Sequence, residues 1–307
     1  MRSPSELEAL IRQEKRAMLL VNTHSRRGEE LFSQSKTLLE ERGFKFLGTY
    51  PIQNPKLLDM TMNEIMREKP SLVILGSGDG TVSSVVGHLA YTDTVLGFLP
   101  LGTTNNFARS LELPLGLEDA VETINSGSVV EVDLGVINGS YFANIASIGI
   151  SVEVAASVPA KLKQYAGRFA YALSGIPAFI GHEPFRSTIV TENTTFNIET
   201  HQLIIANGSY HSGTEIASDA SIDNARLAVF PIGDGGRLQL VRSFAHFILG
   251  RKGSQKEEQF ITAREVTILT DPPRDVEIDG EVKTTTPVRA AVAPKALKVL
   301  VPTIHHG

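Results

Sequence analysis

The sequence predicts an α/β fold with an N-terminal parallel-sheet domain and a C-terminal domain of antiparallel sheet with helical insertions. Up to about residue 126, short apolar runs alternate with stretches of helical periodicity. Strands separated by helices of this length form right-handed βαβ units around a parallel sheet. After about residue 128 the runs become β-branched and alternating, which is typical of antiparallel strands.

The predicted elements of the first part follow one another regularly. The strands are 17–21, 44–50, 71–75 and 95–99, and the helices are 29–41, 55–68 and one that begins at about residue 81. Ligands of parallel sheets bind beyond the carboxyl ends of the strands. We therefore expect function in the loops that follow 71–75 and 95–99.

The second part contains more and shorter strands. They are predicted at 129–137, 141–146, 187–190, 196–206, 227–231, 260–269, 276–278, 288–292 and 297–301. Helical segments at 161–181 and 237–249 interrupt them, and Gly250 follows the second as a C-cap. The expected domains are residues 1–128 and 129–307, with residues 290–307 returning to the first domain.

Composition excludes several classes of protein. The chain has 307 residues, of which 42% are hydrophobic and 21% charged, as in globular proteins. A net charge of -5 argues against a nucleic-acid-binding protein. The absence of cysteine, of a signal-peptide core and of an apolar run of roughly 18 residues predicts a soluble cytoplasmic protein.

The loop Gly76-Ser77-Gly78-Asp79-Gly80-Thr81 connects a buried strand to a helix. Backbone N–H groups and the helix dipole hold phosphate at such a position, and glycines let the backbone approach the ligand. A tight turn without ligand is the simpler alternative. The carboxylate of Asp79 would repel phosphate unless a cation intervenes, so it indicates magnesium.

A second polar loop, Pro100-Leu-Gly-Thr-Thr-Asn-Asn-Phe-Ala-Arg109, follows the next strand. A helix cap explains one of its Thr or Asn residues. Capping alone does not explain why two successive strands both end in polar loops at one edge of the sheet.

The pair GSGDGT and LGTTNNFAR resembles the signature of the diacylglycerol kinase catalytic-domain family, which includes bacterial lipid kinases and sphingosine kinases. Residues 21–28 and the motif Asp279-Gly280-Glu281 resemble two further motifs of that family, in the same order. The resemblance covers nearly the whole chain. It implies a nucleotide-binding α/β domain joined to a β-sandwich domain, with ATP and a lipid substrate in the cleft between them.

The resemblance also implies roles for individual residues. Nucleotide contacts are expected from Asn22, Thr49, Ser77, Gly78, Asp79, Gly80, Thr81 and Thr103. Magnesium is expected at Asp79 and a second metal at Asp223, with Arg26, Arg27 or Arg109 near phosphate. Asp279 or Glu281 would accept the hydroxyl proton, and their proximity would raise the pKa of one of them; Asp133 resembles a carboxylate that interacts with this base.

Three departures from the family pattern bear on these roles. Ser77 replaces a loop glycine, and Asn106 stands where Asp is usual before Phe107. Asn224 and Ala225 occupy the place of an Asp-Gly pair near the second metal, which puts that metal site in doubt.

The expected function is therefore an ATP-dependent, magnesium-dependent lipid kinase that phosphorylates a lipid hydroxyl such as that of diacylglycerol. An NAD-kinase-like phosphotransferase and a catalytically weak lipid- or nucleotide-binding regulator are the alternatives. A lipid substrate requires transient peripheral contact with a membrane, for which the basic and aromatic segment 161–185 is the candidate. The particular lipid and the formation of a homodimer stay open.

Overall fold

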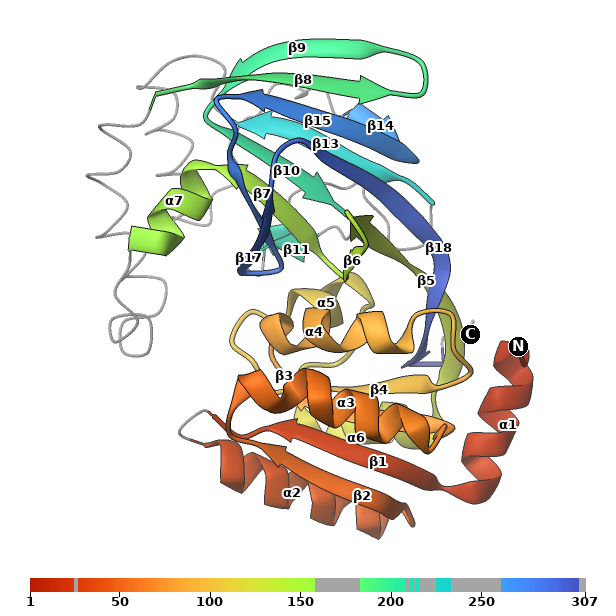
Figure 1. The fold of residues 1–307 in the computed structure, drawn as a ribbon. Helices are drawn as coiled ribbons and strands as arrows, with labels where there is room; N and C mark the ends of the chain where they lie inside the picture. Colours follow the sequence, from red (N-terminus) through yellow and green to blue (C-terminus); the bar gives the residue numbers. More distant parts are fainter. Residues whose placement is uncertain are drawn as a thin grey trace.

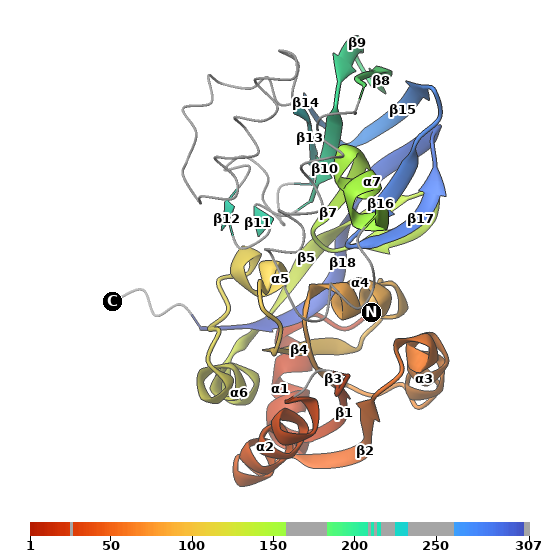
Figure 2. The same cartoon turned by 90° about the vertical axis from the view of Figure 1, so that its left-hand side faces the viewer.

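The computed structural model describes residues 1–24, 27–157, 183–207, 210–211, 214–215, 225–232 and 261–303. In Figure 1 an α/β part lies below and a β part above. The view in Figure 2 shows β5 and β18 running from the lower part into the upper one, with α4 and α5 at the junction.

The α/β part is built from the first eleven elements of the chain. These are α1 (Pro4–Glu14), β1 (Arg16–Asn22), α2 (Gly28–Glu41), β2 (Lys45–Ile52), the 3-10 turn η1 (Pro55–Leu57), α3 (Leu58–Arg67), β3 (Leu72–Ser77), α4 (Asp79–Leu89), β4 (Val95–Pro100), α5 (Asn106–Ser110) and α6 (Leu117–Ser126). Helix α1 is absent from the prediction. It begins with a capping box formed by Ser3 and Glu6 and buries only Leu7 and Ile11, so its apolar stripe is short.

The strands of this part form a parallel sheet in the order β2-β1-β3-β4. Every residue of β3 and β4 is buried, as expected for strands covered on both faces. Helices α3 and α4 pack apolar side chains such as Met62 and Val85 on one face. Helices α1, α2 and α6 pack side chains such as Leu39 and Val121 on the other.

The β part comprises the remaining strands and one helix. They are β5 (Ser128–Ile137), β6 (Ser140–Phe142), β7 (Ile145–Gly149), α7 (Ile150–Ser157), β8 (Phe185–Thr191), β9 (Thr195–Thr200), β10 (Gln202–Ala206), β11 (Tyr210–His211), β12 (Thr214–Glu215), β13 (Leu227–Ile232), β14 (Ile261–Ala263), β15 (Glu265–Asp271), β16 (Asp275–Ile278), β17 (Glu281–Thr285) and β18 (Val288–Val301).

Two antiparallel layers form a sandwich in this part. One layer has the order β14-β13-β10-β7-β16-β17, and the other continues the first sheet through β18-β15-β8-β9. Apolar side chains of both layers, such as Ile205 and Val276 from the first and Ile189 and Val266 from the second, share one core. The predicted fold class, an α/β domain followed by an antiparallel sandwich, is confirmed.

Strand β18 links the two parts. It pairs in parallel with β4, at Val299 and Leu96, and antiparallel with β5 along most of its length. The register shifts between Ala293 and Leu297, which explains why the sequence pattern shows two runs where the structure has one strand. One sheet therefore continues past the expected boundary at residue 128.

Three predicted strands are interrupted in the structure. Strand 141–146 is interrupted between β6 and β7, strand 196–206 at His201, between β9 and β10, and strand 260–269 at Arg264, between β14 and β15. Helix α7 was not predicted. The predicted helices 161–181 and 237–249 lie outside the described residues. None of the described helices is long and apolar enough to cross a membrane.

Candidate functional site

The glycine loop leaves β3 at Ser77 and becomes helix α4 at Asp79. Gly78 is the N-cap residue, with φ -95° and ψ 179°, and no side chain caps the helix there. Gly80 is exposed, and a Cβ added at Gly80 would meet no atom of the described residues within 4 Å. Thr81 accepts a hydrogen bond from Asn22 Nδ2 at 2.8 Å, which ties the end of β1 to the first turn of α4. The N-terminus of α4 thus lacks a side-chain cap among the described residues and faces open space at Gly80.

The second loop packs directly against the first. A Cβ at Gly102 would lie 2.6 Å from Gly78 Cα and 2.7 Å from Asn105 Oδ1, so only glycine fits. Asn105 adopts a left-handed conformation, with φ 48°, and its side chain accepts from Gly102 N and donates to Pro100 O. The two polar loops therefore form one structural unit.

Asp79 joins the two loops through its carboxylate. Its Oδ2 accepts from Thr104 Oγ1 and its Oδ1 from the backbone N–H of Phe107, both at 2.9 Å. Arg109 reinforces the second loop by donating to Thr104 O at 2.9 Å. The carboxylate is partly exposed, and each of its oxygens accepts one of these two bonds. Asp79 thus has a structural contact in addition to its predicted role with magnesium.

Asp279 is enclosed by hydrogen-bond donors from two parts of the chain. Backbone N–H groups of Ala143, Asn144 and Ile145 reach its carboxylate at 2.9, 3.3 and 3.0 Å, and Ser83 Oγ of helix α4 donates to Oδ2. Burial raises the pKa of Asp279 to about 6, although these hydrogen bonds lower it. We expected a neighbouring carboxylate to raise this pKa, and burial is the main cause instead.

The Asp279-Gly280 turn connects β16 to β17. Ile278 pairs with Glu281, and both central residues have positive φ, 46° and 96°, as a two-residue type I′ turn requires. Glu281 is exposed and forms an ion pair with Lys283. The two candidate bases therefore differ: Asp279 is surrounded by donors, whereas Glu281 is open to solvent.

Asp133 lies on β5, 3% exposed. Its carboxylate accepts from Lys295 N at 2.8 Å and from Ala225 N at 2.7 Å, two residues with positive φ. It therefore fixes the irregular part of β18 and the segment before β13. The interaction with the base that the resemblance implies for Asp133 stays a prediction.

A buried polar group that sequence reasoning missed lies beside Asp133. Asn207 Nδ2 donates to the carbonyls of Asp133 and Ala143, and its backbone N–H donates to Asn144 O. The side chain of Asn144 is 2% exposed and has no hydrogen-bond partner among the described residues. The position of Asn144 between the short apolar strands β6 and β7 is the one feature of the sequence that indicates a buried polar group here.

The other expected site residues are placed as follows. Thr103 is exposed in the second loop, and Ser77 is buried with its Oγ directed to Gly78 O at 3.1 Å. Thr49 is exposed within β2, opposite Leu19, and the strand continues to Ile52. It does not lie at the strand end, where we expected it.

The arginines and the metal ligands complete the comparison. Arg27 is exposed and paired with Glu30. Arg26 and Asp223 lie outside the described residues, which contain no group of three His, Cys, Asp or Glu side chains that could hold a metal ion. A divalent cation at Asp79 would therefore take its remaining oxygen ligands from phosphate or water.

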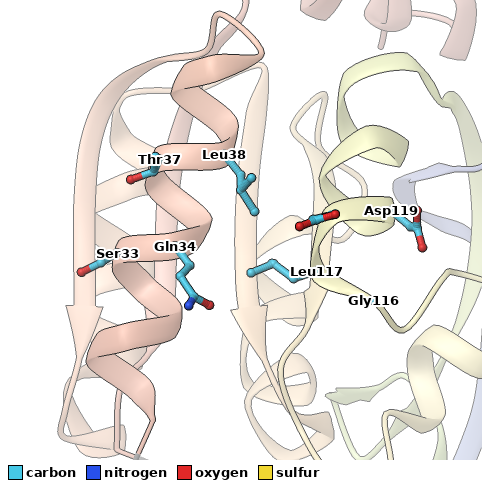
Figure 3. A pocket seen from close by; sticks show the side chains of 8 residues that line it. Ser33, Gln34, Thr37, Leu38, Gly116, Leu117 and Asp119 are labelled. Carbon is cyan, nitrogen blue, oxygen red and sulfur yellow. The ribbon is translucent and has the colours of Figure 1, made fainter.

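A shallow groove between α2 and α6 lies apart from this site (Figure 3). Its volume is about 660 Å³, and it is lined by Ser33, Gln34, Thr37, Leu38, Gly116, Leu117, Glu118 and Asp119. It lies on the side of the parallel sheet opposite α3 and α4. Gly116 is the N-cap of α6 here, but the described residues of the lining include no Lys or Arg. The carboxylates of Glu118 and Asp119 in the lining would repel phosphate, so we do not assign the chemistry to this groove.

Comparisons with known proteins identify the family of the chain. Residues 16–137 match the family model of the diacylglycerol kinase catalytic domain, and residues 144–301 match that of the YegS C-terminal NAD kinase beta sandwich-like domain. The chain is 28% identical over 275 residues to a diacylglycerol kinase of Bacillus subtilis, covering 87% of this chain and 90% of that protein. It is 29% identical to an uncharacterised Synechocystis protein, covering 76% of this chain and 56% of that protein.

The fold has close counterparts among solved structures. The crystal structure of a diacylglycerol kinase from Bacillus anthracis superposes with a TM-score of 0.76 at 23% identity, covering 94% of this chain and 97% of the other. This likeness concerns the fold, and the two family models together extend over both parts of the chain. The chain belongs to the lipid kinase family that combines a diacylglycerol kinase catalytic domain with a YegS C-terminal NAD kinase beta sandwich-like domain.

Proposed function

We propose that this protein is an ATP-dependent kinase that transfers the γ-phosphoryl group to a lipid hydroxyl, such as that of diacylglycerol. The observation that carries the proposal is the position of helix α4. Its N-terminus is the glycine loop, in which Gly80 is exposed, and Ser83, one turn further, contacts the acidic turn at Asp279. One helix thus connects a phosphate-binding position to carboxylates that can accept a proton.

The phosphates of ATP fit the N-terminus of α4. The first N–H groups of a helix have no partner within the helix, and the dipole favours negative charge at this end. The absence of a side-chain cap and the open space at Gly80 leave room for phosphate oxygens. Exposed Gly102 and Thr103 of the second loop border the same space.

Magnesium, when bound with ATP, neutralises charge on the phosphate oxygens. Asp79 suits this ion because its carboxylate is partly exposed. Each carboxylate oxygen accepts one hydrogen bond, from Thr104 or from Phe107, and an ionised carboxylate has about four acceptor positions. Those two bonds hold the carboxylate in a fixed orientation at the first turn of α4.

The acidic turn supplies the proton acceptor for the lipid hydroxyl. Asp279 has a pKa near the working range of a general base, raised to about 6 by burial, but its oxygens already accept four hydrogen bonds. Glu281 is exposed, and its carboxylate forms an ion pair with Lys283. Substitution of each carboxylate distinguishes the two.

The test is a transfer assay with γ-labelled ATP and magnesium over a panel of acceptors. The panel contains diacylglycerol, monoacylglycerol, ceramide, sphingosine, phosphatidylglycerol and NAD. NAD is included because the second family model describes an NAD kinase beta sandwich-like domain. Label in a lipid supports the proposal, and label in NAD alone supports the second candidate. A folded chain that binds ATP and labels nothing is the weak regulator.

Access to a lipid substrate requires peripheral contact with a bilayer. We propose that anionic membranes attract the chain reversibly through segment 161–185, which holds Lys161 and Lys163. Vesicle sedimentation should show binding that increases with the fraction of anionic lipid and decreases with salt. A Lys161→Glu, Lys163→Glu variant should bind less. Normal vesicle binding by this variant would exclude the segment.

A further inference from the structure

We propose that Ser83 is a positioning residue for phosphoryl transfer, which docks the acidic turn 279–281 onto helix α4 at a fixed distance from the glycine loop. The inference rests on the proposed function and adds to it a residue that none of the sequence motifs assigns. It applies whichever carboxylate of the turn accepts the proton.

The four hydrogen-bond donors to Asp279 come from two different parts of the chain. Three are backbone N–H groups of residues 143–145, which belong to the same β part as the turn. The fourth is the hydroxyl of Ser83, from helix α4. Of the hydrogen bonds to this carboxylate, the one from Ser83 is therefore the one that connects the turn to the glycine-loop helix.

Hydrogen bonds occupy all the acceptor positions of the Asp279 carboxylate. An ionised carboxylate offers about four acceptor positions, and each oxygen of Asp279 accepts two hydrogen bonds. The carboxylate is consequently held from both sides, and none of the four donors is a cation. Removing Ser83 leaves a partly buried carboxylate with one vacant position facing α4, so the turn loses its contact with that helix.

Asp79 and Ser83 lie one turn apart on helix α4. Ser83 follows Asp79 by four residues, so both lie on one face of the helix, about 6 Å apart along its axis. Asp79 is itself fixed to the second loop through Thr104 and Phe107. The first turn of α4 therefore acts as a rigid spacer between the glycine loop and the carboxylates of the turn, and Ser83 makes the contact one turn along the helix.

The neighbouring residue provides a matched control. Ser84 is also a serine of α4, but its hydroxyl bonds back to Gly80 O at 3.5 Å, within the same helix. Ser84→Ala removes the same atoms from the same helix without touching Asp279. Ser83→Thr retains a hydroxyl and tests rescue of the contact.

The experiment combines a titration with kinetics on the full chain. The pKa of the Asp279 carboxyl is followed by carbon-detected NMR in the wild type and in Ser83→Ala, Ser83→Thr and Ser84→Ala. A hydrogen bond to the ionised form lowers a pKa. We expect the pKa to rise by about one pH unit in Ser83→Ala, and to stay at the wild-type value in Ser84→Ala. An unchanged pKa in Ser83→Ala would overturn the proposal.

The kinetic part separates positioning from a general loss of structure. We expect kcat for lipid phosphorylation to fall about tenfold in Ser83→Ala, with KM for ATP unchanged, and to recover partly in Ser83→Thr. Equal losses in Ser83→Ala and Ser84→Ala, or a rise in KM for ATP in place of a fall in kcat, would overturn the proposal. If the wild type transfers no phosphate while Ser83→Ala raises the pKa, the proposed function is wrong and Ser83 is only a structural link.

Discussion

Gly78 and Gly102 place their backbones against each other where β3 and β4 end. A Cβ on Gly102 would approach Gly78 Cα to 2.6 Å, a separation that real Cβ atoms do not show. Gly78 is also the N-cap of α4. The second loop thus sets the position of the helix N-terminus to which we assign the phosphates.

Gly102→Ala should separate the two loops. Overpacking of this kind costs about 1–3 kcal/mol, so we expect a lower melting temperature together with at least a tenfold weaker binding of ATP. Thermal denaturation and calorimetric ATP titration measure the two effects. Unchanged ATP affinity would show that the junction of Gly78 with Gly102 does not shape the nucleotide site.

Gly80→Ala tests the loop without disturbing it. Its φ is ordinary and a Cβ there meets nothing within 4 Å, so the fold should be as stable as the wild type or slightly more stable. A methyl group would nevertheless occupy space that we assign to phosphate. We expect KM for ATP to rise about tenfold or more at an unchanged melting temperature. A KM equal to that of the wild type would place the phosphates elsewhere.

Asp279→Asn and Glu281→Gln distinguish the two candidate bases. Replacement of Glu281 removes only an exposed ion pair with Lys283, worth about 0–1 kcal/mol, so any loss of turnover is chemical. Replacement of Asp279 also places an amide N–H₂ among four donors and should lower stability. The variant that lacks the base should lose about 10²–10⁴ in kcat, with ATP binding retained. Full turnover in both would mean that the base lies outside the turn.

The raised pKa of Asp279 predicts a dependence on pH. If this carboxylate accepts the proton, kcat should rise tenfold per pH unit below about 6 and level off above it. The folded-state pKa, about 6, exceeds the ordinary value of 3.8, so the protonated group stabilises the fold below about pH 3.8. That contribution decreases between pH 3.8 and 6, relative to Asp279→Asn. A kcat profile without an inflection near 6 would exclude Asp279 as the base.

The sequence predicted the parallel sheet and both polar loops because these features are local. A fully apolar strand, a glycine turn and a helical period are each visible within a window of about 15 residues. An Asp-Gly pair also favours the positive φ of a two-residue hairpin turn, which Asp279 and Gly280 adopt. Strand β18 was predicted as two runs because its irregularity at Lys295 depends on a hydrogen bond to Asp133, which is distant in sequence.

The contacts around the candidate site could not be predicted in the same way. Ser83 is separated from Asp279 by 196 positions, and nothing near either residue indicates the other. Asn105 adopts a left-handed conformation to hold Gly102, and Asn207 satisfies carbonyls of two separate strands. Such side chains are selected by tertiary geometry, so their identities carry no periodic signal.

The proposed lipid kinase activity is measured as transfer of label from γ-labelled ATP to diacylglycerol in mixed micelles, by the wild type and by Asp79→Asn. An Asn side chain can keep the contacts with Thr104 and Phe107 while losing the charge, so the melting temperature should hardly change. We expect labelled phospholipid from the wild type and a loss of about 10²–10³ in rate in Asp79→Asn. A variant that transfers phosphate as fast as the wild type, or a folded wild type that labels no lipid of the panel, would contradict this expectation.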